Sequence, residues 1–284
     1  MEFAYYPGCS LHSTGKEFDA SVRAVLGALD VDLRELPDWN CCGASSAHSL
    51  SESLAVSLPA RNLAIAQQAG LDVVMPCAAC FNRHKAAESA LRSDQAERGQ
   101  VERALGMSLD RWVTVRPLLD VLCSAVGLQA IAAKVTRPLA GLRAVGYYGC
   151  LLVRPHAITQ FEDPENPVLM NQLLDVMGAE VRTWSYATEC CGGALSITRP
   201  GVAGRLVERL VGHAREAGAE TIVTSCPLCQ VNLEMRQAHG QKRVPIFYIS
   251  ELLGLAFGLQ EVDRWWDLHL IDPRPALRSL ELTA

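Results

Sequence analysis

The stretch Cys41-Cys42-Gly43, followed after 34 residues by Cys77-Ala78-Ala79-Cys80, occurs a second time as Cys190-Cys191-Gly192 and Cys226-Pro227-Leu228-Cys229. The second copy keeps the same interval of 34 residues. A single cysteine precedes each copy, with 31 residues between Cys9 and the first pair and 39 residues between Cys150 and the second. Ten of the 11 cysteines belong to this repeat. Its period of about 145 residues indicates duplication of a whole domain and is too long for a solenoid.

Five cysteines per copy form a set suited to a metal cluster. A CxxC turn brings two thiolates to one metal centre, whereas adjacent cysteines such as Cys41 and Cys42 reach two irons of a cluster more easily than one ion. Five thiolates also exceed the four that a tetrahedral zinc site or an ordinary cubane requires. Gly43 and Gly192 allow backbone angles with which the chain can wrap a bulky group. The set predicts an unusual cluster, or a cluster with one spare thiol.

Composition narrows the class of protein further. The chain has 284 residues, of which 49% are apolar, and a net charge of −5 without a basic run, so it gives no reason to expect nucleic-acid binding. No apolar stretch approaches the roughly 20 residues that span a bilayer, and no basic region opens a signal peptide. We therefore expect a soluble, cytoplasmic protein. Clustered cysteines in a reducing compartment bind metal or carry redox chemistry more often than they form disulfides.

Strands and helices are expected to alternate in both copies. The apolar pattern predicts strands over 2–7, 31–36 and 71–75 and helices over 16–29, 48–69 and 80–92, and in the second copy strands over 143–148, 180–184 and 220–224 and helices over 167–178, 200–217 and 229–238. We expect two tandem α/β domains, 1–140 and 141–284, each with a parallel sheet and cysteines at the carboxyl ends of its strands. Residues 104–142 are expected to be mainly helical, most clearly over 117–128, and 258–284 to form a tail packed on the surface.

These motifs resemble those of the CCG-domain family, whose best-known member is the B subunit of heterodisulfide reductase. The likeness extends from Tyr5 to about Glu251. It implies one non-cubane 4Fe–4S cluster per copy, each held by five cysteines, and disulfide cleavage between the two clusters. The implied ligands are, in the first copy, Cys9, Cys41, Cys42, Cys77 and Cys80, and in the second Cys150, Cys190, Cys191, Cys226 and Cys229.

The resemblance also implies partners and a substrate class. We expect an oxidoreductase acting on sulfur groups, with a ferredoxin-like C subunit and a flavin-bearing A subunit as partners, because the chain has no nucleotide fingerprint of its own. The chain resembles bacterial heterodisulfide reductase-like proteins of sulfur oxidation more closely than the methanogenic reductases, and this resemblance implies sulfur on a lipoate-binding carrier as the substrate. Where the reductases commonly carry a histidine after the first cysteine of the second copy, this chain has Leu151, which predicts a more apolar cavity.

Two other functions remain open at this level. The same clusters could relay electrons for a flavin dehydrogenase of the glycolate, lactate or succinate type. Alternatively, one copy could hold zinc, since CxxC and two more thiolates would satisfy it.

Several other residues have less specific interpretations. Cys123 has no repeat partner and is expected to be a buried structural thiol. His12 and His156 follow the first cysteine of each copy and are candidates for a hydrogen bond to a cluster, although surface positions are commoner. The pairs Tyr147-Tyr148 and Trp265-Trp266 are expected to serve packing.

Overall fold

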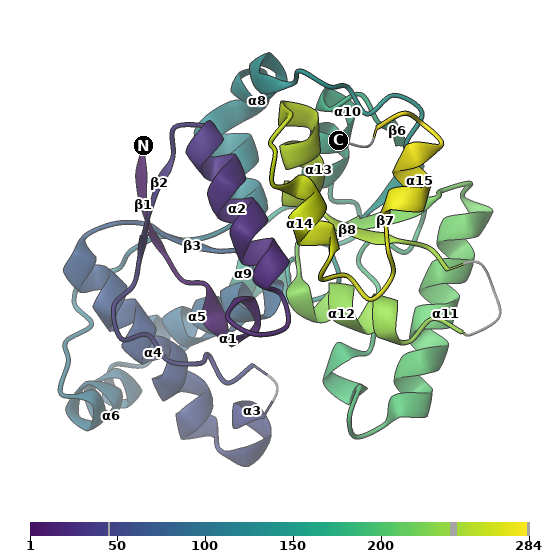
Figure 1. The fold of residues 1–284 in the computed structure, drawn as a ribbon. Coiled ribbons are helices and arrows are strands. Elements are labelled where there is room, and N and C mark those ends of the chain that lie inside the picture. The colour runs from purple at the N-terminus through teal and green to yellow at the C-terminus, as the bar shows by residue number, and fades with distance from the viewer. Residues whose placement is uncertain (45, 239–242, 283–284) are drawn as a thin grey trace.

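Two four-stranded parallel sheets form the framework of the computed structural model, which describes residues 1–44, 46–238 and 243–282 (Figure 1). The strand order is β2-β1-β3-β4 in the first sheet and β6-β5-β7-β8 in the second, so the strands of the two copies correspond one to one. The strands are β1 (Glu2–Tyr5), β2 (Asp32–Glu35), β3 (Val73–Met75), β4 (Val115–Pro117), β5 (Arg143–Tyr147), β6 (Glu180–Val181), β7 (Thr221–Thr224) and β8 (Ile246–Tyr248). The expected class, tandem duplicated α/β domains, is confirmed.

Helices connect the strands in both copies. In the first copy they are α1 (Gly8–Leu11), α2 (Lys16–Ala28), α3 (Ala47–Leu50), α4 (Glu52–Ala69), α5 (Ala78–Ser93), α6 (Gln95–Leu105), α7 (Leu118–Asp120), the π-helix η1 (Val121–Gly127) and α8 (Leu128–Lys134). In the second they are α9 (His156–Thr159), α10 (Leu169–Val176), the 3-10 helix η2 (Gly193–Leu195), α11 (Pro200–Glu216), α12 (Pro227–Met235), α13 (Ile249–Phe257), α14 (Val262–Trp266) and α15 (Arg274–Arg278). Within the described ranges, no helix has both the length and the apolar character needed to cross a membrane.

Local sequence explains most of these elements. The strand residues Val73–Met75 and Thr221–Thr224 are completely buried, as expected for central strands of a parallel sheet. On α2, Phe18, Val22 and Val25 recur at helical spacing and are buried on one side. Helix α4 begins after Ser51, whose hydroxyl accepts a hydrogen bond from the backbone N–H of Leu54.

The fourth strand of each sheet was not predicted. β4 lies inside the connector that was expected to be mainly helical, and β8 lies in a stretch for which no strand was expected. Each is only three residues long, and β4 contains Pro117, so the hydrophobic pattern is too short to identify them. The stretch 117–128 is largely helical as predicted, while the expected strand 180–184 is reduced to Glu180–Val181.

The two copies pack against each other reciprocally. Helix α2 of the first copy lies against α13 of the second, and α10 of the second lies against α8 of the first. In the same way α5 contacts α9, and α12 contacts α1. The hydroxyls of Ser21 and Ser250 lie 2.7 Å apart where α2 meets α13. These exchanged contacts relate the copies by an approximate twofold axis. They also place α5 beside α9 and α1 beside α12.

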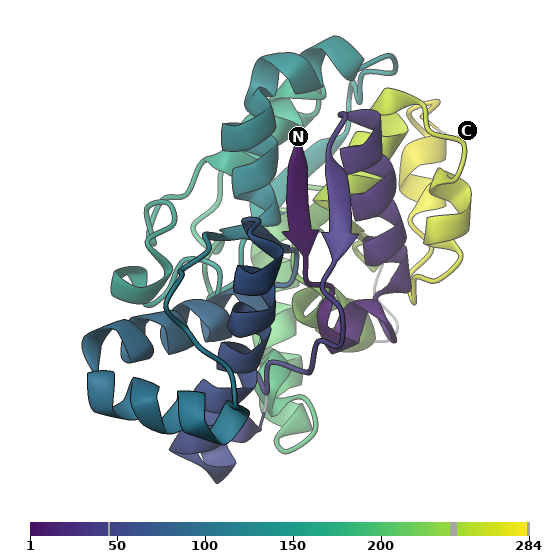
Figure 2. The same cartoon turned by 90° about the vertical axis from the view of Figure 1, so that its left-hand side faces the viewer.

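The C-terminal segment belongs to the core, which corrects the expectation of a surface tail. Val262, Trp265 and Trp266 of α14 are buried, and α14 packs against α2 (Figure 2). The Trp266 ring lies edge-on to Phe247 with centroids 6.0 Å apart. The two tryptophans therefore serve packing, as predicted. Residues 283–284 of the expected tail lie outside the described residues.

Candidate metal centre

The first five cysteines converge from three strand ends. Cys9 lies in α1 directly after β1, Cys41 and Cys42 lie in the loop after β2, and Cys77 precedes α5 after β3, with Cys80 in its first turn. The Sγ atoms of Cys9 and Cys41 are 3.6 Å apart, and those of Cys42 and Cys80 are 3.4 Å apart. All five predicted residues are thus brought to the carboxyl edge of the first sheet.

The second five cysteines repeat this arrangement. The Sγ atoms of Cys191 and Cys229 lie 3.7 Å apart, matching the Cys42–Cys80 pair. Cys150 and Cys190, which correspond to Cys9 and Cys41, lie near enough for each thiol to shift the pKa of the other. The sequence repeat is therefore also a repeat of side-chain geometry.

A glycine leaves room for the sulfurs in each copy. Gly8 and Gly149 immediately precede the first cysteine and adopt φ angles of +72° and +66°. A Cβ atom at Gly8 would lie 3.0 Å from Cys80 Sγ, and one at Gly149 would lie 3.0 Å from Cys229 Sγ. Any side chain at these positions would displace a sulfur that the site requires.

Backbone amides also point at the sulfurs. The N atom of Gly43 lies 3.4 Å from Cys41 Sγ, and that of Gly192 lies 3.3 Å from Cys190 Sγ. Such N–H···S contacts stabilise negative charge on sulfur and are a recurrent means of tuning iron–sulfur sites. The glycine after each cysteine pair therefore both turns the chain and donates to a ligand.

A buried tyrosine lies beside the sulfurs in each copy, although the sequence pattern predicted no more than a packing role for the Tyr147-Tyr148 pair. Tyr6 donates a hydrogen bond to Asn40 O at 2.8 Å, and Tyr147 donates one to Glu189 O at 2.7 Å. Burial, and then the neighbouring thiols of the same copy, raise the pKa of both hydroxyls. The signal was present in the sequence as the shared pattern Tyr-x-Gly-Cys, in which Tyr6 corresponds to Tyr147.

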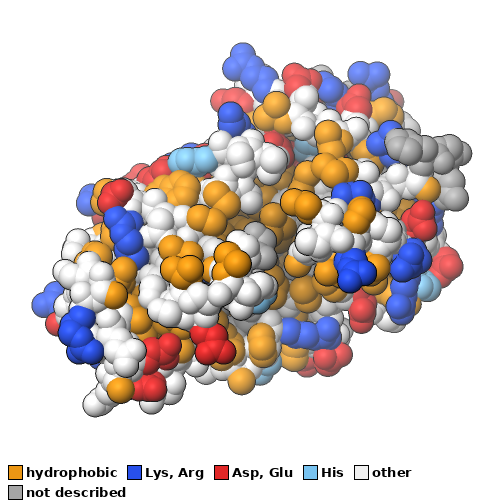
Figure 3. Space-filling view, turned by 90° about the horizontal axis from the view of Figure 1, so that it is seen from below, with side chains coloured by type: hydrophobic (Ala, Val, Ile, Leu, Met, Phe, Trp, Pro, Cys, Tyr) orange, Lys and Arg blue, Asp and Glu red, His pale blue; other side chains and the backbone are white. Residues whose placement is uncertain are grey.

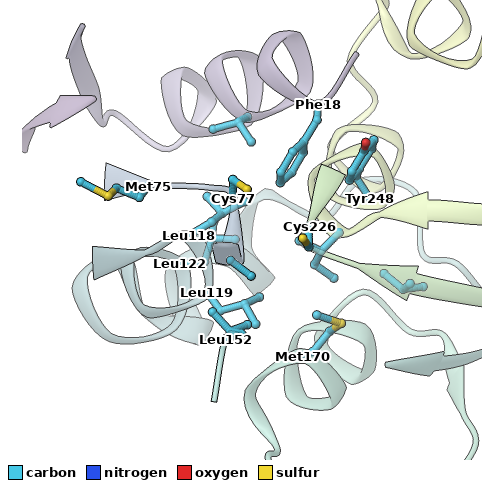
Figure 4. Packing of buried hydrophobic residues seen from close by; sticks show 14 of the residues in the cluster. Phe18, Met75, Cys77, Leu118, Leu119, Leu122, Leu152, Met170, Cys226 and Tyr248 are labelled. Carbon is cyan, nitrogen blue, oxygen red and sulfur yellow. The ribbon is translucent and has the colours of Figure 1, made fainter. Parts of the chain in front are cut away.

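The two sets of cysteines meet at the boundary between the copies. The thiols of Cys77 and Cys226, the first cysteines of the two CxxC turns, are both buried and lie near enough for each to shift the pKa of the other. Figure 4 shows them close together, with the stacked rings of Phe18 and Tyr248 beside Cys226. Two groups held by the two sets would therefore be immediate neighbours.

The site is open on one side. Cys9, Cys41 and Cys190 are exposed and Cys150 is half-buried, whereas the other six cysteines of the repeat are buried. The face seen in Figure 3 is hollowed near its centre, and hydrophobic side chains surround the hollow. A molecule from outside can therefore reach sulfurs of both copies.

The thiols differ in acidity in a way that suits ligation. Hydrogen bonds from Cys42 and Cys9 lower the pKa of Cys41 to about 2, and a hydrogen bond from Cys150 lowers the pKa of Cys190 to about 6. In contrast, the hydrogen bond to Cys226, with burial, raises the pKa of Cys77 well above its usual value. Thiolates are the form that binds metal, but several buried thiolates this close repel one another unless a cation compensates them.

The donor set fits a thiolate-bound metal group. Five soft sulfur ligands per copy suit iron–sulfur chemistry or zinc rather than magnesium or calcium. At the end of β7, the hydroxyl of Thr224 is buried with no hydrogen-bond partner in the described structure, two residues before Cys226. An unfilled donor at this depth is costly unless a bound group accepts from it. When bound, iron–sulfur clusters here would supply one-electron redox chemistry.

The predicted accessory residues lie elsewhere, and one that was not predicted lies at the site. His12 lies 3.4 Å from Glu35, His156 is exposed, and neither has a contact with a cysteine in the described ranges. Cys123 is half-buried, with Sγ 3.8 Å from Leu169 O, so it is apart from both sets. His84, one helical turn after Cys80, is buried against Tyr6, and burial lowers its pKa to about 4, which keeps it neutral.

Fold and site together define a tandem cysteine-cluster protein of the α/β class. A family model described as "CCG: Cysteine-rich domain" matches residues 3–83 and 144–234, and the chain belongs to this family. More particularly, it is a member that resembles the B subunit of heterodisulfide reductase, as its relatives show. The B subunit of a CoB-CoM heterodisulfide reductase of Methanosarcina acetivorans is 26% identical over 90% of this chain and 89% of its own. A heterodisulfide reductase B-like protein of Archaeoglobus profundus is 26% identical over 91% of both chains.

Another relative bears a different name. The 8-methylmenaquinol:fumarate reductase membrane anchor subunit of Wolinella succinogenes is 32% identical over 95% of this chain and 97% of its own. Among solved structures, a hypothetical protein from Helicobacter pylori superposes with a TM-score of 0.71 at 10% identity. It covers 95% of this chain, which spans 51% of that protein's length, and the likeness shows the fold alone.

Proposed function

We propose that each copy ligates one non-cubane 4Fe–4S cluster through its five cysteines and that the two clusters act together as a two-electron site for disulfides or sulfane sulfur. The ligands would be, in the first copy, Cys9, Cys41, Cys42, Cys77 and Cys80, and in the second Cys150, Cys190, Cys191, Cys226 and Cys229. The geometry supports this through the matching glycines, tyrosines and N–H···S contacts of the two copies.

The observation that carries the proposal is the proximity of the buried thiols of Cys77 and Cys226 (Figure 4). Cleavage of a disulfide needs two electrons, and a one-electron step at an isolated centre would release a thiyl radical. Two adjacent one-electron centres avoid that species. The chain's contribution is to hold the two cysteine sets in contact and to leave Cys9, Cys41 and Cys190 reachable from solvent.

The lining of the site supports an apolar sulfur substrate. Leu151, directly after Cys150, is half-buried, and its carbonyl accepts a hydrogen bond of 3.0 Å from Asn82 of the other copy. Its side chain offers no hydrogen-bonding group, so we favour a lipoyl-like dithiol or sulfane carrier in a sulfur-oxidising complex over a highly charged coenzyme disulfide. Electrons would pass to or from a ferredoxin-like subunit and a flavin-bearing subunit.

Metal analysis and a substrate titration test this proposal. Anaerobically purified protein should contain about eight irons and eight acid-labile sulfides per chain. Oxidised lipoamide on a carrier protein should then reoxidise dithionite-reduced clusters, followed by electron paramagnetic resonance (EPR). Near-stoichiometric zinc without labile sulfide would contradict the cluster assignment. Half the iron with one zinc would restrict it to one copy and exclude the paired mechanism.

A second function is favoured by the 32% identity to the menaquinol:fumarate reductase subunit, which exceeds the identity to the reductase B subunits. The clusters would then relay electrons from a quinol in a fumarate reductase-like complex. An exposed apolar side chain follows each cysteine pair in the sequence: Leu50 is 77% exposed and Ile197 is 93% exposed. These two side chains would suit contact with a lipid surface. Reduction of the clusters by a menaquinol analogue in liposomes, and no reaction with the lipoyl carrier, would establish this alternative.

A further inference from the structure

A group of buried ionisable side chains lies behind the second cysteine set. It consists of Glu17 from α2, Glu234 from α12, Glu251 from α13 and His269 from the C-terminal segment. His269 Nδ1 lies 2.9 Å from Glu234 Oε1, and its Nε2 lies 2.9 Å from Glu251 Oε1. The imidazole is completely buried between the two carboxylates. The group joins both copies of the repeat and has no part in metal ligation.

The two carboxylates that hold His269 are fully satisfied. Glu234 also accepts a hydrogen bond from the backbone N–H of Leu270 at 2.7 Å, and Glu251 accepts one from that of Tyr248 at 2.8 Å. Burial by itself would lower the pKa of His269, but Glu251 and Glu234 outweigh it and raise the pKa to about 11. His269 is therefore an imidazolium at neutral pH, and the three residues together carry one net negative charge.

Glu17 is the member without a partner. Its side chain is 3% exposed, and within the described residues it forms no ion pair and no hydrogen bond to another residue. Burial raises the pKa of Glu17 most, and the charge of Glu251 raises it further. A hydrogen bond from its own backbone N–H acts in the opposite direction, and the resulting pKa is about 7. Ionisation of Glu17 would put a second uncompensated negative charge into the same buried space.

None of the charged groups around Glu17 is a cation free to compensate its negative charge in the described structure. Those that face it are Glu234, Glu251, His269 and the hydroxyl of Tyr248. On the same helix Arg23 is engaged by Asp19 and Glu35, and Lys16 is exposed. Glu35 of β2 and His12 beside α1 pair with each other. On α14, Arg264 is exposed. The described residues therefore supply Glu17 with no cation beyond the imidazolium that two carboxylates already share.

Tyr248 connects this group to the second cysteine set. Its hydroxyl lies 3.4 Å from Oε1 of Gln230, the residue after Cys229, and its ring stacks on Phe18, the residue after Glu17, at 4.2 Å between centroids. The charges of Glu17, Glu251 and Cys226 all act on this buried hydroxyl. Glu17 and Cys226 thus both act on one buried side chain, in a region of low dielectric constant where charges interact strongly.

We propose that Glu17 is a proton acceptor coupled to reduction of the second-copy cluster: it takes one proton from solvent when that cluster takes one electron from a one-electron donor such as a ferredoxin-like subunit. The proton adds to a carboxylate oxygen of Glu17, so that the incoming negative charge is compensated nearby. The inference rests on the proposed function, since it requires a redox-active cluster in that copy.

The test is the pH dependence of the cluster's reduction potential in the full chain, measured by EPR-monitored redox titration. Below about pH 7 Glu17 is already protonated and the potential should be constant. Above it, reduction takes up a proton, and the equilibrium constant should fall up to tenfold per pH unit, which is about 59 mV for one electron. In Glu17→Gln the potential should be independent of pH and equal to the wild-type value at low pH.

Two controls separate this inference from a general effect of charge. Glu208→Gln removes an exposed carboxylate from α11 and should retain the wild-type pH dependence. Proton uptake on reduction, followed with a pH indicator in wild-type protein, gives a second readout that needs no variant. A cluster whose potential does not change with pH, or whose pH dependence survives in Glu17→Gln, would overturn this inference alone. A second copy without a redox-active cluster would overturn the proposed function as well.

Discussion

The cysteines of the two copies differ in exposure according to their position in the motif. The single cysteine and the first of the adjacent pair are reachable from solvent, whereas the second of the pair and both cysteines of CxxC are buried. Of the buried members, Cys77 and Cys226 lie near each other at the boundary between the copies (Figure 4). One end of each set therefore suits contact with substrate and the other suits contact with the neighbouring set.

Substitution of single cysteines should separate the two clusters. Cys229→Ala removes a buried ligand of the second copy, so we expect iron per chain to fall to about half while the EPR signal of the first copy remains. Cys123→Ala is the control, because that thiol lies 3.8 Å from Leu169 O and outside both sets. Loss of iron from Cys123→Ala would show that the ligands are assigned incorrectly.

The glycine before the first cysteine can be tested against a glycine of similar backbone conformation. Gly149→Ala places a Cβ atom 3.0 Å from Cys229 Sγ, so the second cluster should be lost. Gly218 has a φ of +76°, and apart from its two chain neighbours no described residue has an atom within 4 Å of the place that an added Cβ would take, so Gly218→Ala should cost only about 1–2 kcal/mol of strain. Equal iron contents in the two variants would contradict the proposed steric role of Gly149.

At the level of elements, helix α2 of the first copy packs against β8 and α13 of the second copy and so holds the two copies together. Phe18 is fully buried and stacks on Tyr248, and the hydroxyls of Ser21 and Ser250 meet one turn further along. The same helix carries Glu17 into the buried ionisable group. Packing of α2 therefore determines both the interface and the surroundings of the second cysteine set.

Truncation of Phe18 should measure this contact. Phe18→Ala removes a fully buried aromatic ring, and we expect the free energy of unfolding to fall by about 3–5 kcal/mol in denaturant titrations. Leu50→Ala, at a side chain that is 77% exposed, should change it by less than about 0.5 kcal/mol. If Phe18→Ala lowered the free energy of unfolding by less than about 1 kcal/mol, α2 would contribute little to the interface between the copies.

At the scale of the whole molecule, the two copies share one hydrophobic core. Buried residues of both copies belong to a single continuous cluster, and the exchanged contacts of α2 with α13 and of α10 with α8 bury faces of each copy against the other. The linker is bound too, since the N–H groups of Thr136 and Arg137 donate to Ala256 O at 2.9 and 3.0 Å. The two copies have similar folds, but each copy alone would expose the apolar helix faces that it buries against the other copy.

Separate production of the halves tests this dependence. We expect fragments 1–140 and 141–284, the domain division that the repeat predicts, to show no cooperative thermal unfolding by circular dichroism when produced alone. Together they should recover a single transition, because the exposed faces of α2 and α13 would again be buried. Cooperative unfolding of each isolated half would establish two autonomous domains.

The sequence by itself determined the duplication, the parallel α/β class and the clustering of five cysteines at each set of strand ends. These follow from spacing and local periodicity, which are properties of neighbouring residues along the chain. It also contained the signal for Tyr6 and Tyr147, the shared pattern Tyr-x-Gly-Cys, but the meaning of that pattern depended on knowing that both rings lie beside sulfurs. The strands β4 and β8 were missed because each has only three residues, and so short an apolar pattern cannot be distinguished from that of a loop or a helix end.

Only the tertiary structure decided how the two halves meet. The proximity of Cys77 to Cys226 and the assembly of Glu17 with Glu234, Glu251 and His269 join residues from different copies, far apart in sequence. The C-terminal segment was expected on the surface, yet Trp266 and the His269 side chain are buried. Local periodicity describes one element at a time, whereas these contacts depend on which exposed faces pair when both copies bury their apolar surface together.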